Sequence, residues 1–288
     1  MKKKSYRRYS ARSESLRMCL HNVDFMVGLI MIISVILIAV FAPQIAHYSY
    51  SKQGAGPRLT APCAEYPFGT DELGRDVFSK TIYGTRIALW VAALGASIQL
   101  ILGVTIGLVC GYYGKWVDHV FSFITDLTWC IPGTILALAV VTILGKGLTN
   151  VVIAISIVSW ASFARPIRAK TMSLRNMAFV ETGKAYGENG FSLMFRYILP
   201  NIIPSIIVMT SMTLPETILS TTTLSFLGLG SKSPSPDWGL ALSKGMEYIT
   251  RAPWLSIFPG IALVYTTIGF NLLGEGLRDV LDPQMRSR

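Results

Sequence analysis

The stretch from Ile87 to Gly114 reads IALWVAALGASIQLILGVTIGLVCGYYG and contains no charged residue in 28 positions. About 20 consecutive apolar residues are enough for an α-helix to cross the hydrocarbon core of a bilayer. The strands of a membrane β-barrel would instead alternate polar and apolar positions, and this stretch has no such alternation. The stretch therefore predicts a transmembrane α-helix.

The composition of the whole chain agrees with a membrane location. Of the 288 residues, 51% are hydrophobic and only 15% are charged, whereas an ordinary globular domain has about 25% charged residues. So few charges cannot cover the surface of a soluble domain of this size. The sequence also lacks the polarity of a disordered chain and the repeats of collagen or a coiled coil. We therefore expect an all-α membrane protein.

Five further tracts of low charge bring the expected number of transmembrane helices to six. The first of them has no small-residue cleavage site after it, so we interpret it as an anchor and not as a signal peptide. These tracts run from Phe25 to Ala42, from near Val117 to Gly145 with Asp126 inside, from Gly147 to Ala164, from Tyr197 to Ser231 with Glu216 inside, and from Ala252 to Gly274.

The distribution of lysine and arginine predicts the orientation. With a cytoplasmic N-terminus, 17 of the 26 basic residues fall in cytoplasmic segments. Cytoplasmic loops of membrane proteins carry such an excess, so we expect both termini in the cytoplasm. This bias accounts for most of the net charge of +10, and we expect membrane lipid but no nucleic acid as a partner.

These spans divide the chain into segments. The predicted segments are a basic cytoplasmic N-terminal segment at 1–23, a first transmembrane helix at 24–46, an external loop at 47–86, a membrane core at 87–277 with a cytoplasmic loop at 165–200 and an external loop at 228–253, and a cytoplasmic tail at 278–288.

The sequence contains no arrangement of catalytic, cofactor-binding or metal-binding residues. The four cysteines form no CxxC pair, and the three histidines are isolated. A phosphate-binding loop needs Ser or Thr after its Gly-Lys pair, but here Trp, Gly or Ala follows the Gly-Lys pairs that begin at Gly114, Gly145 and Gly183. The HExxH and GxSxG patterns of an intramembrane hydrolase are also absent. We therefore do not expect an enzyme.

The predicted cytoplasmic loop contains a spaced motif. It reads Glu181-Thr-Gly-Lys-Ala-Tyr-Gly187, then nine residues, then Tyr197-Ile-Leu199-Pro200. This resembles the EAA loop of permease subunits in ATP-binding-cassette (ABC) importers, which reads Glu-Ala-Ala, three residues, Gly, nine residues, Ile-x-Leu-Pro. In this chain Thr182 and Gly183 replace the two alanines, and Tyr197 replaces the isoleucine.

Three more blocks are similar to one branch of these permeases, the dipeptide, oligopeptide and nickel permeases. They lie in order along nearly the whole chain. The blocks are Phe68–Ser79 with Tyr83–Arg86, Leu224–Gly230 with Pro236–Gly239, and Asn271–Pro283.

The resemblance implies a fold of six transmembrane helices with a coupling loop that docks on an ATPase subunit. It also implies a location in the bacterial inner membrane and four kinds of partner: a second, homologous permease, two ATPase subunits that hold ATP and Mg²⁺, an external substrate-binding protein, and lipid. No cofactor is expected in this chain. The residues that the resemblance places in ATPase docking are Glu181, Ala185, Tyr186, Gly187, Leu199 and Pro200.

Two regions outside the coupling loop are further candidates. Gly69–Asp76 looks like a helix start in which Thr70 or Asp71 is the cap, and it is either a structural turn or a contact for the external binding protein. The loop with Pro236, Asp237 and Trp238 is the better candidate for that contact.

Asp126 and Glu216 are exceptional because a carboxylate within a span is costly and usually faces a cavity or a cationic partner. Both are candidates for the lining of a translocation path.

The resemblance leaves two classes of substrate open, which are peptides and nickel or a metal chelate. We favour peptides because they are the broader class within the family. A function of another class is a proton-coupled secondary transporter that uses Asp126 and Glu216. It would need no ATPase and would leave the long basic loop without a role.

Overall fold

The computed structural model describes residues 21–281, and this part of the chain is helical, without β-strands. The N-terminal residues up to 20, and the end of the tail from 282 on with Pro283 of the last sequence block, lie outside the described residues. The helices are α2 (Val23–Val40), α3 (Ala42–Ile45), α4 (Val77–Tyr113), α5 (Lys115–Trp129), α6 (Gly133–Leu144), α7 (Leu148–Leu174), α8 (Ala178–Ala185), α9 (Gly190–Ser192), a π-helix (Leu193–Ile198), α10 (Leu199–Phe226), α11 (Trp238–Glu247) and α12 (Trp254–Leu281).

Five helical segments among the described residues are long and apolar enough to cross a membrane. They are α2, α4, α7, α12, and α10 together with the short helices that lead into it. The pair α5 and α6 passes the same test as one broken span, which raises the number to six. The predicted all-α membrane fold is confirmed.

The third predicted helix is not continuous. Helices α5 and α6 meet at an angle of 96°, and the break falls at Cys130–Pro132. Proline has no amide hydrogen for the helix, and its ring disfavours helical geometry at the preceding residue. The prediction of one helix from Val117 to Gly145 was therefore wrong.

Helix α4 begins ten residues before the predicted start at Ile87. Its N-cap is Asp76, whose carboxylate accepts hydrogen bonds from the backbone N–H groups of Phe78 and Ser79. The prediction of a cap at Thr70 or Asp71 was thus wrong. The early start also shortens the predicted external loop at 47–86.

The charged residues in this first part of α4 are satisfied by other segments. Arg86 donates from Nε to the carbonyl of Ala39 at 2.6 Å and from Nη2 to that of Val40 at 3.1 Å. These are carbonyls of the last turn of α2, which have no partner within their own helix. Arg86 therefore fixes the end of the first span to the second span.

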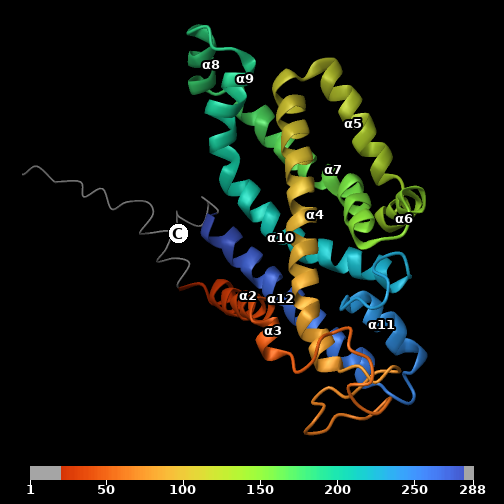
Figure 1. Ribbon diagram of the computed structural model, residues 1–288. Helices are drawn as coiled ribbons and strands as arrows, with labels where there is room; N and C mark the ends of the chain where they lie inside the picture. Colours follow the sequence, from red (N-terminus) through yellow and green to blue (C-terminus); the bar gives the residue numbers. More distant parts are fainter. Residues whose placement is uncertain (1–20, 282–288) are drawn as a thin grey trace, which may run out of the picture.

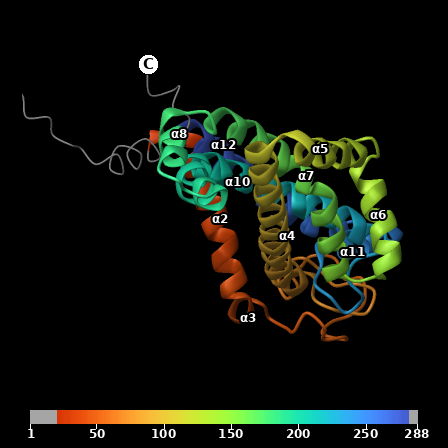
Figure 2. The same ribbon diagram turned by 90° about the horizontal axis from the view of Figure 1, so that it is seen from above.

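Helix α4 runs through the middle of the molecule. Figure 2 places α2 and α6 on opposite sides of it. Its glycines allow close contact with α7: a Cβ at Gly103 would lie 2.2 Å from the Cβ of Phe163, and one at Gly107 would lie 2.7 Å from the carbonyl oxygen of Ala164. Small residues commonly permit such close helix packing in membranes.

The two ends of the molecule carry different short elements (Figure 1). We call them the α8 end, with α8 and α9, and the α11 end, with α11 and the loop between α3 and α4. Helix α7 continues through Pro166 to Leu174. The predicted loop at 165–200 therefore begins inside a helix, and most of its residues are helical.

Candidate functional site

Helix α8 carries the sequence motif of the coupling loop and has two distinct faces. On one face Val180 is fully buried in a core cluster with Leu193 and Ile198. Gly183 lies on the same side, where a Cβ would be 2.7 Å from Cδ2 of Leu193. A side chain at this position would therefore push Leu193 aside.

The other face of α8 is open to the surroundings. Glu181, Lys184, Ala185 and Tyr186 are exposed, and Tyr186 exposes 85% of its surface. Nζ of Lys184 pairs with Oε1 of Glu181 at 2.8 Å, where both side chains are largely exposed. The helix therefore presents an amphiphilic surface that is fixed from beneath by its buried side.

Gly187 ends α8 in a left-handed conformation, with φ of +81°. The N–H of Gly187 donates to the carbonyl of Lys184, and the N–H of Glu188 donates to that of Gly183. These two bonds form a Schellman motif, which glycine favours because it has no Cβ. A Cβ at Gly187 would meet nothing within 4 Å, so the backbone and not crowding selects glycine here.

Glu188 organises the chain after α8, although no sequence pattern singled it out. Its carboxylate accepts hydrogen bonds from Oγ of Ser192 and, at 3.2 Å, from Oη of Tyr197. Arg196 lies 3.6 Å away. The hydrogen bond from Ser192, with smaller contributions from Tyr197 and Arg196, lowers the pKa of Glu188. Tyr197 stands where the family motif has isoleucine, so its hydroxyl gives this loop an additional link.

The other two predicted docking residues, Leu199 and Pro200, do not belong to the exposed face of α8. Leu199 is partly buried and packs against the core cluster beneath α8. Pro200 is exposed in the first turn of α10, directly after the π-helix. Because proline cannot donate to the preceding turn, it fits at this junction. Both residues define where α10 starts.

Asp126 has a cationic partner within the chain. Its Oδ1 lies 2.5 Å from Nη2 of Arg165 on α7, and the guanidinium lies over the ring of Trp129 at 4.3 Å. One turn further along α7, Arg168 binds Asp118 through Nε and Nη2. The two ion pairs connect α5 to α7 beside a cavity of about 340 Å³.

Glu216 lies on α10 and is exposed. It opens into a cavity of about 240 Å³ between α6, α7 and α10, which Thr134, Ser159 and Ser220 also line. Within residues 21–281 no lysine, arginine or histidine pairs with it. The two intramembrane carboxylates therefore differ, since Asp126 is paired and Glu216 is not.

Comparison with known proteins agrees with this arrangement. Residues 103–287 match the family described as binding-protein-dependent transport system inner membrane component, and residues 12–62 match the N-terminal transmembrane domain of oligopeptide transport permease C. The chain is 43% identical to the dipeptide transport system permease protein DppC of Alkalihalophilus pseudofirmus, over 98% of this chain and 93% of that protein.

The chain belongs to the binding-protein-dependent transport system inner membrane component family. Other permeases that it resembles are the glutathione transport system permease protein GsiD of Pectobacterium atrosepticum and the oligopeptide transport system permease protein OppC of Bacillus subtilis. The first is 39% identical over 89% of this chain and 85% of that protein. The second is 37% identical over 91% of this chain and 86% of that protein.

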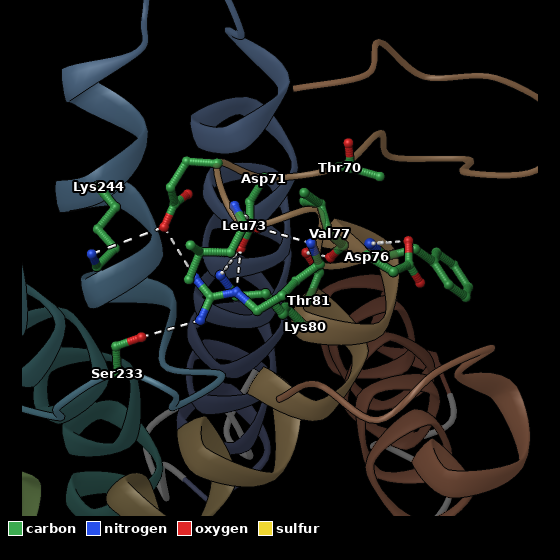
Figure 3. Close-up of polar contacts among 12 residues, drawn as sticks. Thr70, Asp71, Leu73, Asp76, Val77, Lys80, Thr81, Ser233 and Lys244 are labelled. Carbon is green, nitrogen blue, oxygen red and sulfur yellow. Dashed lines mark hydrogen bonds and ion pairs between the residues drawn. The ribbon is translucent and has the colours of Figure 1, made fainter. Parts of the chain in front are cut away.

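At the α11 end of this permease, Asp71 is the centre of a buried polar network (Figure 3). Its Oδ2 lies 2.6 Å from Nε of Arg75 and 3.0 Å from Nζ of Lys80. Arg75 also donates to Ser233 and Glu72, each at 3.1 Å. Burial alone would raise the pKa of Asp71, but Lys80, a backbone N–H and Arg75 together lower it below its ordinary value of 3.8.

This network supports the structural interpretation of Gly69–Asp76. Asp71 and Arg75 are each only 2% exposed, so neither offers a surface to another protein. Through Ser233 the network joins the first loop of the permease to the loop after α10. The residues of this motif thus connect two segments that are far apart along the chain.

The prediction that Pro236, Asp237 and Trp238 contact a binding protein is corrected, because all three are buried. Oδ1 of Asp237 accepts the N–H of Gly239 and caps α11. Nε1 of Trp238 donates to the carbonyl of Thr81 on α4 at 3.1 Å. These residues hold α11 against the permease core. The exposed residues of the loop between α10 and α11 are instead Leu227, Gly228 and 232–234.

Proposed function

We propose that this chain is the membrane-spanning permease subunit of an ABC importer that carries peptides into the cell. The observation that carries this proposal is the 43% identity to a dipeptide permease over almost the whole chain. The two further relatives are named for glutathione and oligopeptide transport, and both of these substrates are peptides. The names of these three relatives therefore favour peptides over nickel or a metal chelate.

In this proposal α8 is the element that docks in a groove of an ATPase subunit. Its exposed face offers Glu181, Ala185 and Tyr186, and its buried face transmits force to the core through Val180. Gly187 keeps the end of the helix compact. ATP and Mg²⁺ are held by the ATPase subunits, and this chain supplies no residue for hydrolysis.

The α8 end then faces the cytoplasm, together with both chain termini, and the protein lies in the bacterial inner membrane. The excess of basic residues in these segments supports this orientation. The complete importer contains a second, homologous permease, two ATPase subunits and an external substrate-binding protein. The binding protein meets the α11 end, where the loop residues 232–234 are exposed.

Transport follows from rocking of the spans when the ATPase subunits close. We assign Glu216 to the lining of the translocation path because its carboxylate opens into a cavity. Asp126 has a different role in this proposal: its ion pair with Arg165 holds α5 against α7 while the spans move.

Reconstitution of the permease with its partner subunits in proteoliposomes tests the function. ATP inside the vesicles and binding protein outside are expected to drive uptake of a labelled dipeptide. Gly187→Arg is expected to abolish transport-coupled ATP turnover while the complex still inserts and assembles.

Three results would contradict the proposal. Uptake driven by a pH gradient without the ATPase subunits would indicate a secondary transporter. Uptake of nickel or a nickel chelate, but not of peptides, would overturn the substrate. Unchanged uptake by the Gly187→Arg variant would remove α8 from coupling.

A further inference from the structure

The cavity beside Glu216 is built from three helices that each present one row of side chains. Helix α10 contributes Glu216 and, one turn later, Ser220, which lie on the same face at i and i+4. Helices α6 and α7 contribute the rest of the polar lining. The volume is about 240 Å³, and the complete lining is Gly133, Thr134, Ala137, Ile155, Val158, Ser159, Glu216, Ser220 and Leu224.

Glu216 lies deep within its span. It is ten residues from Phe226, the last residue of α10, and this corresponds to about 15 Å along the helix axis. A carboxylate at that depth is costly unless it faces water or a cation. Since no cationic residue among the described residues pairs with Glu216, the cavity must supply what satisfies it.

The hydroxyl groups that line the cavity also lack hydrogen-bond partners within the described residues. Thr134, Ser159 and Ser220 form no side-chain hydrogen bond within residues 21–281. Other hydroxyls on the same helices bond to their own backbone: Thr142 donates to Leu138 on α6, Ser156 to Val152 on α7 and Thr223 to Leu219 on α10. The three hydroxyls beside Glu216 therefore have both their O–H hydrogens and their oxygen lone pairs available to a ligand.

We propose that this cavity binds a primary ammonium group of the peptide in transit, with Glu216 as its counter-ion and the hydroxyls of Thr134, Ser159 and Ser220 as additional acceptors. An ammonium group has three N–H donors and no acceptor, so a carboxylate surrounded by hydroxyl oxygens matches it. The apolar walls formed by Ala137 and Leu224 suit the hydrocarbon part of the peptide. The inference rests on the proposed function and adds the chemical group that the path recognises.

Cysteine labelling of the complete importer in proteoliposomes tests this site without requiring transport. Ser220→Cys is introduced after the native cysteines have been replaced, because Cys63 and Cys130 are exposed. The labels are aminoethyl methanethiosulfonate, which carries a primary ammonium group, and the anionic sulfonatoethyl methanethiosulfonate. Both labelling rates are normalised to those of a small thiol in solution. Val264→Cys is the matched control, because Val264 lies ten residues from the outer end of α12 and is 54% exposed on an apolar surface.

We expect the cationic reagent to label the cysteine at position 220 at least about tenfold faster than the anionic one, because the charge of Glu216 acts at short range. Glu216→Gln should remove this preference, and Glu216→Asp should keep it. Phenethylamine should protect the cysteine when position 216 carries a carboxylate, while phenylethanol should not. The Val264→Cys control should react with neither reagent.

Two results would overturn the inference. Equal normalised rates for the two reagents, with or without Glu216→Gln, would show that the carboxylate does not select cations. Absence of labelling at position 220 would show that the face is covered, for example by a cation of the second permease. Peptide uptake is measured in the same vesicles. If the vesicles take up no peptide but the cysteine at position 220 still reacts faster with the cationic reagent, the proposed function is rejected and the site is not. If the vesicles take up peptide but the cysteine shows no preference for the cationic reagent, the site alone is rejected.

Discussion

Asp71 and Arg75 form an ion pair of 2.6 Å in which each side chain is only 2% exposed. The pair lies at the start of the second span, and Lys80 of α4 approaches the same carboxylate oxygen at 3.0 Å. The loop before α4 is thereby fixed to α4 itself and, through Ser233, to the loop after α10. At the α11 end of the molecule, the ends of several spans thus depend on one carboxylate.

Asp71→Asn is expected to destabilise the permease by about 3–5 kcal/mol, because it leaves two buried cations without their shared partner. Thermal unfolding of the purified protein in nanodiscs measures the change. Lys244→Met is the matched control. Its pair with Glu72 spans 4.0 Å and Lys244 is 38% exposed, so its loss should cost less than about 1 kcal/mol. Equal effects of the two substitutions would contradict the central role of Asp71.

The contribution of Asp71 should depend on pH with a definite sign. Its folded-state pKa is lowered below 3.8, so folding favours the ionised form. The stabilisation is therefore complete above the unfolded-state pKa and is lost as the pH falls through the lower folded-state value. Unfolding of the original protein and of Asp71→Asn, compared from about pH 6 to about pH 2.5, should give a difference that shrinks only at the acid end. A difference that grew toward low pH would refute the assignment.

Substitutions at Gly187 should rank by their tolerance of positive φ. Alanine meets no atom there, but a left-handed conformation costs it about 1–2 kcal/mol, whereas asparagine adopts that conformation more readily. Gly187→Ala should therefore reduce the hydrogen-exchange protection of the amides of Gly187 and Glu188 more than Gly187→Asn does. Coupled ATP turnover should follow the same order. The opposite order would show that side-chain contact with a partner, and not backbone conformation, selects glycine.

Substitutions at Tyr186 and Ile198 should have separate effects, the first on ATPase binding and the second on the free energy of unfolding. Tyr186 is 85% exposed, so Tyr186→Ala should change the free energy of unfolding by less than about 0.5 kcal/mol. It should nevertheless weaken ATPase binding by about 2 kcal/mol if the tyrosine anchors the interface. Ile198 is fully buried, and Ile198→Ala should cost about 2–5 kcal/mol of stability. Thermal unfolding and titration with the ATPase subunit measure the two quantities. Full ATPase affinity of the Tyr186→Ala variant would exclude the tyrosine as an anchor.

Much of the fold could be predicted from single stretches of sequence. A span needs a long apolar tract regardless of its neighbours, because lipid provides no hydrogen-bond partners for the backbone. The spacing from Glu181 to Pro200 likewise led to α8 and to the start of α10. Gly187 of this motif has a φ of +81°, a backbone conformation that glycine adopts readily.

The errors about the start of α4 and about Trp238 share one physical origin, which is that distant segments satisfy polar groups whose partners cannot be identified from the local sequence. Lys80 and Arg86 fall in the predicted external loop, but Asp71 and the last carbonyls of α2 allow both cations to lie inside α4. Trp238 is predicted to contact a binding protein, but it donates a hydrogen bond to the backbone of α4. The 96° break between α5 and α6 followed from Pro132, whose position in the tract was visible although its effect on the span was not predicted.

By itself, the sequence determined that this protein is helical and crosses a membrane, and it located the motif of α8, because hydropathy and motif spacing are local properties. Only the tertiary structure decided which charges are paired. It joined Asp126 to Arg165, 39 residues apart, and left Glu216 facing a cavity. The energy of a charge in a membrane depends on what lies within a few ångströms of it, and that is fixed by packing between helices.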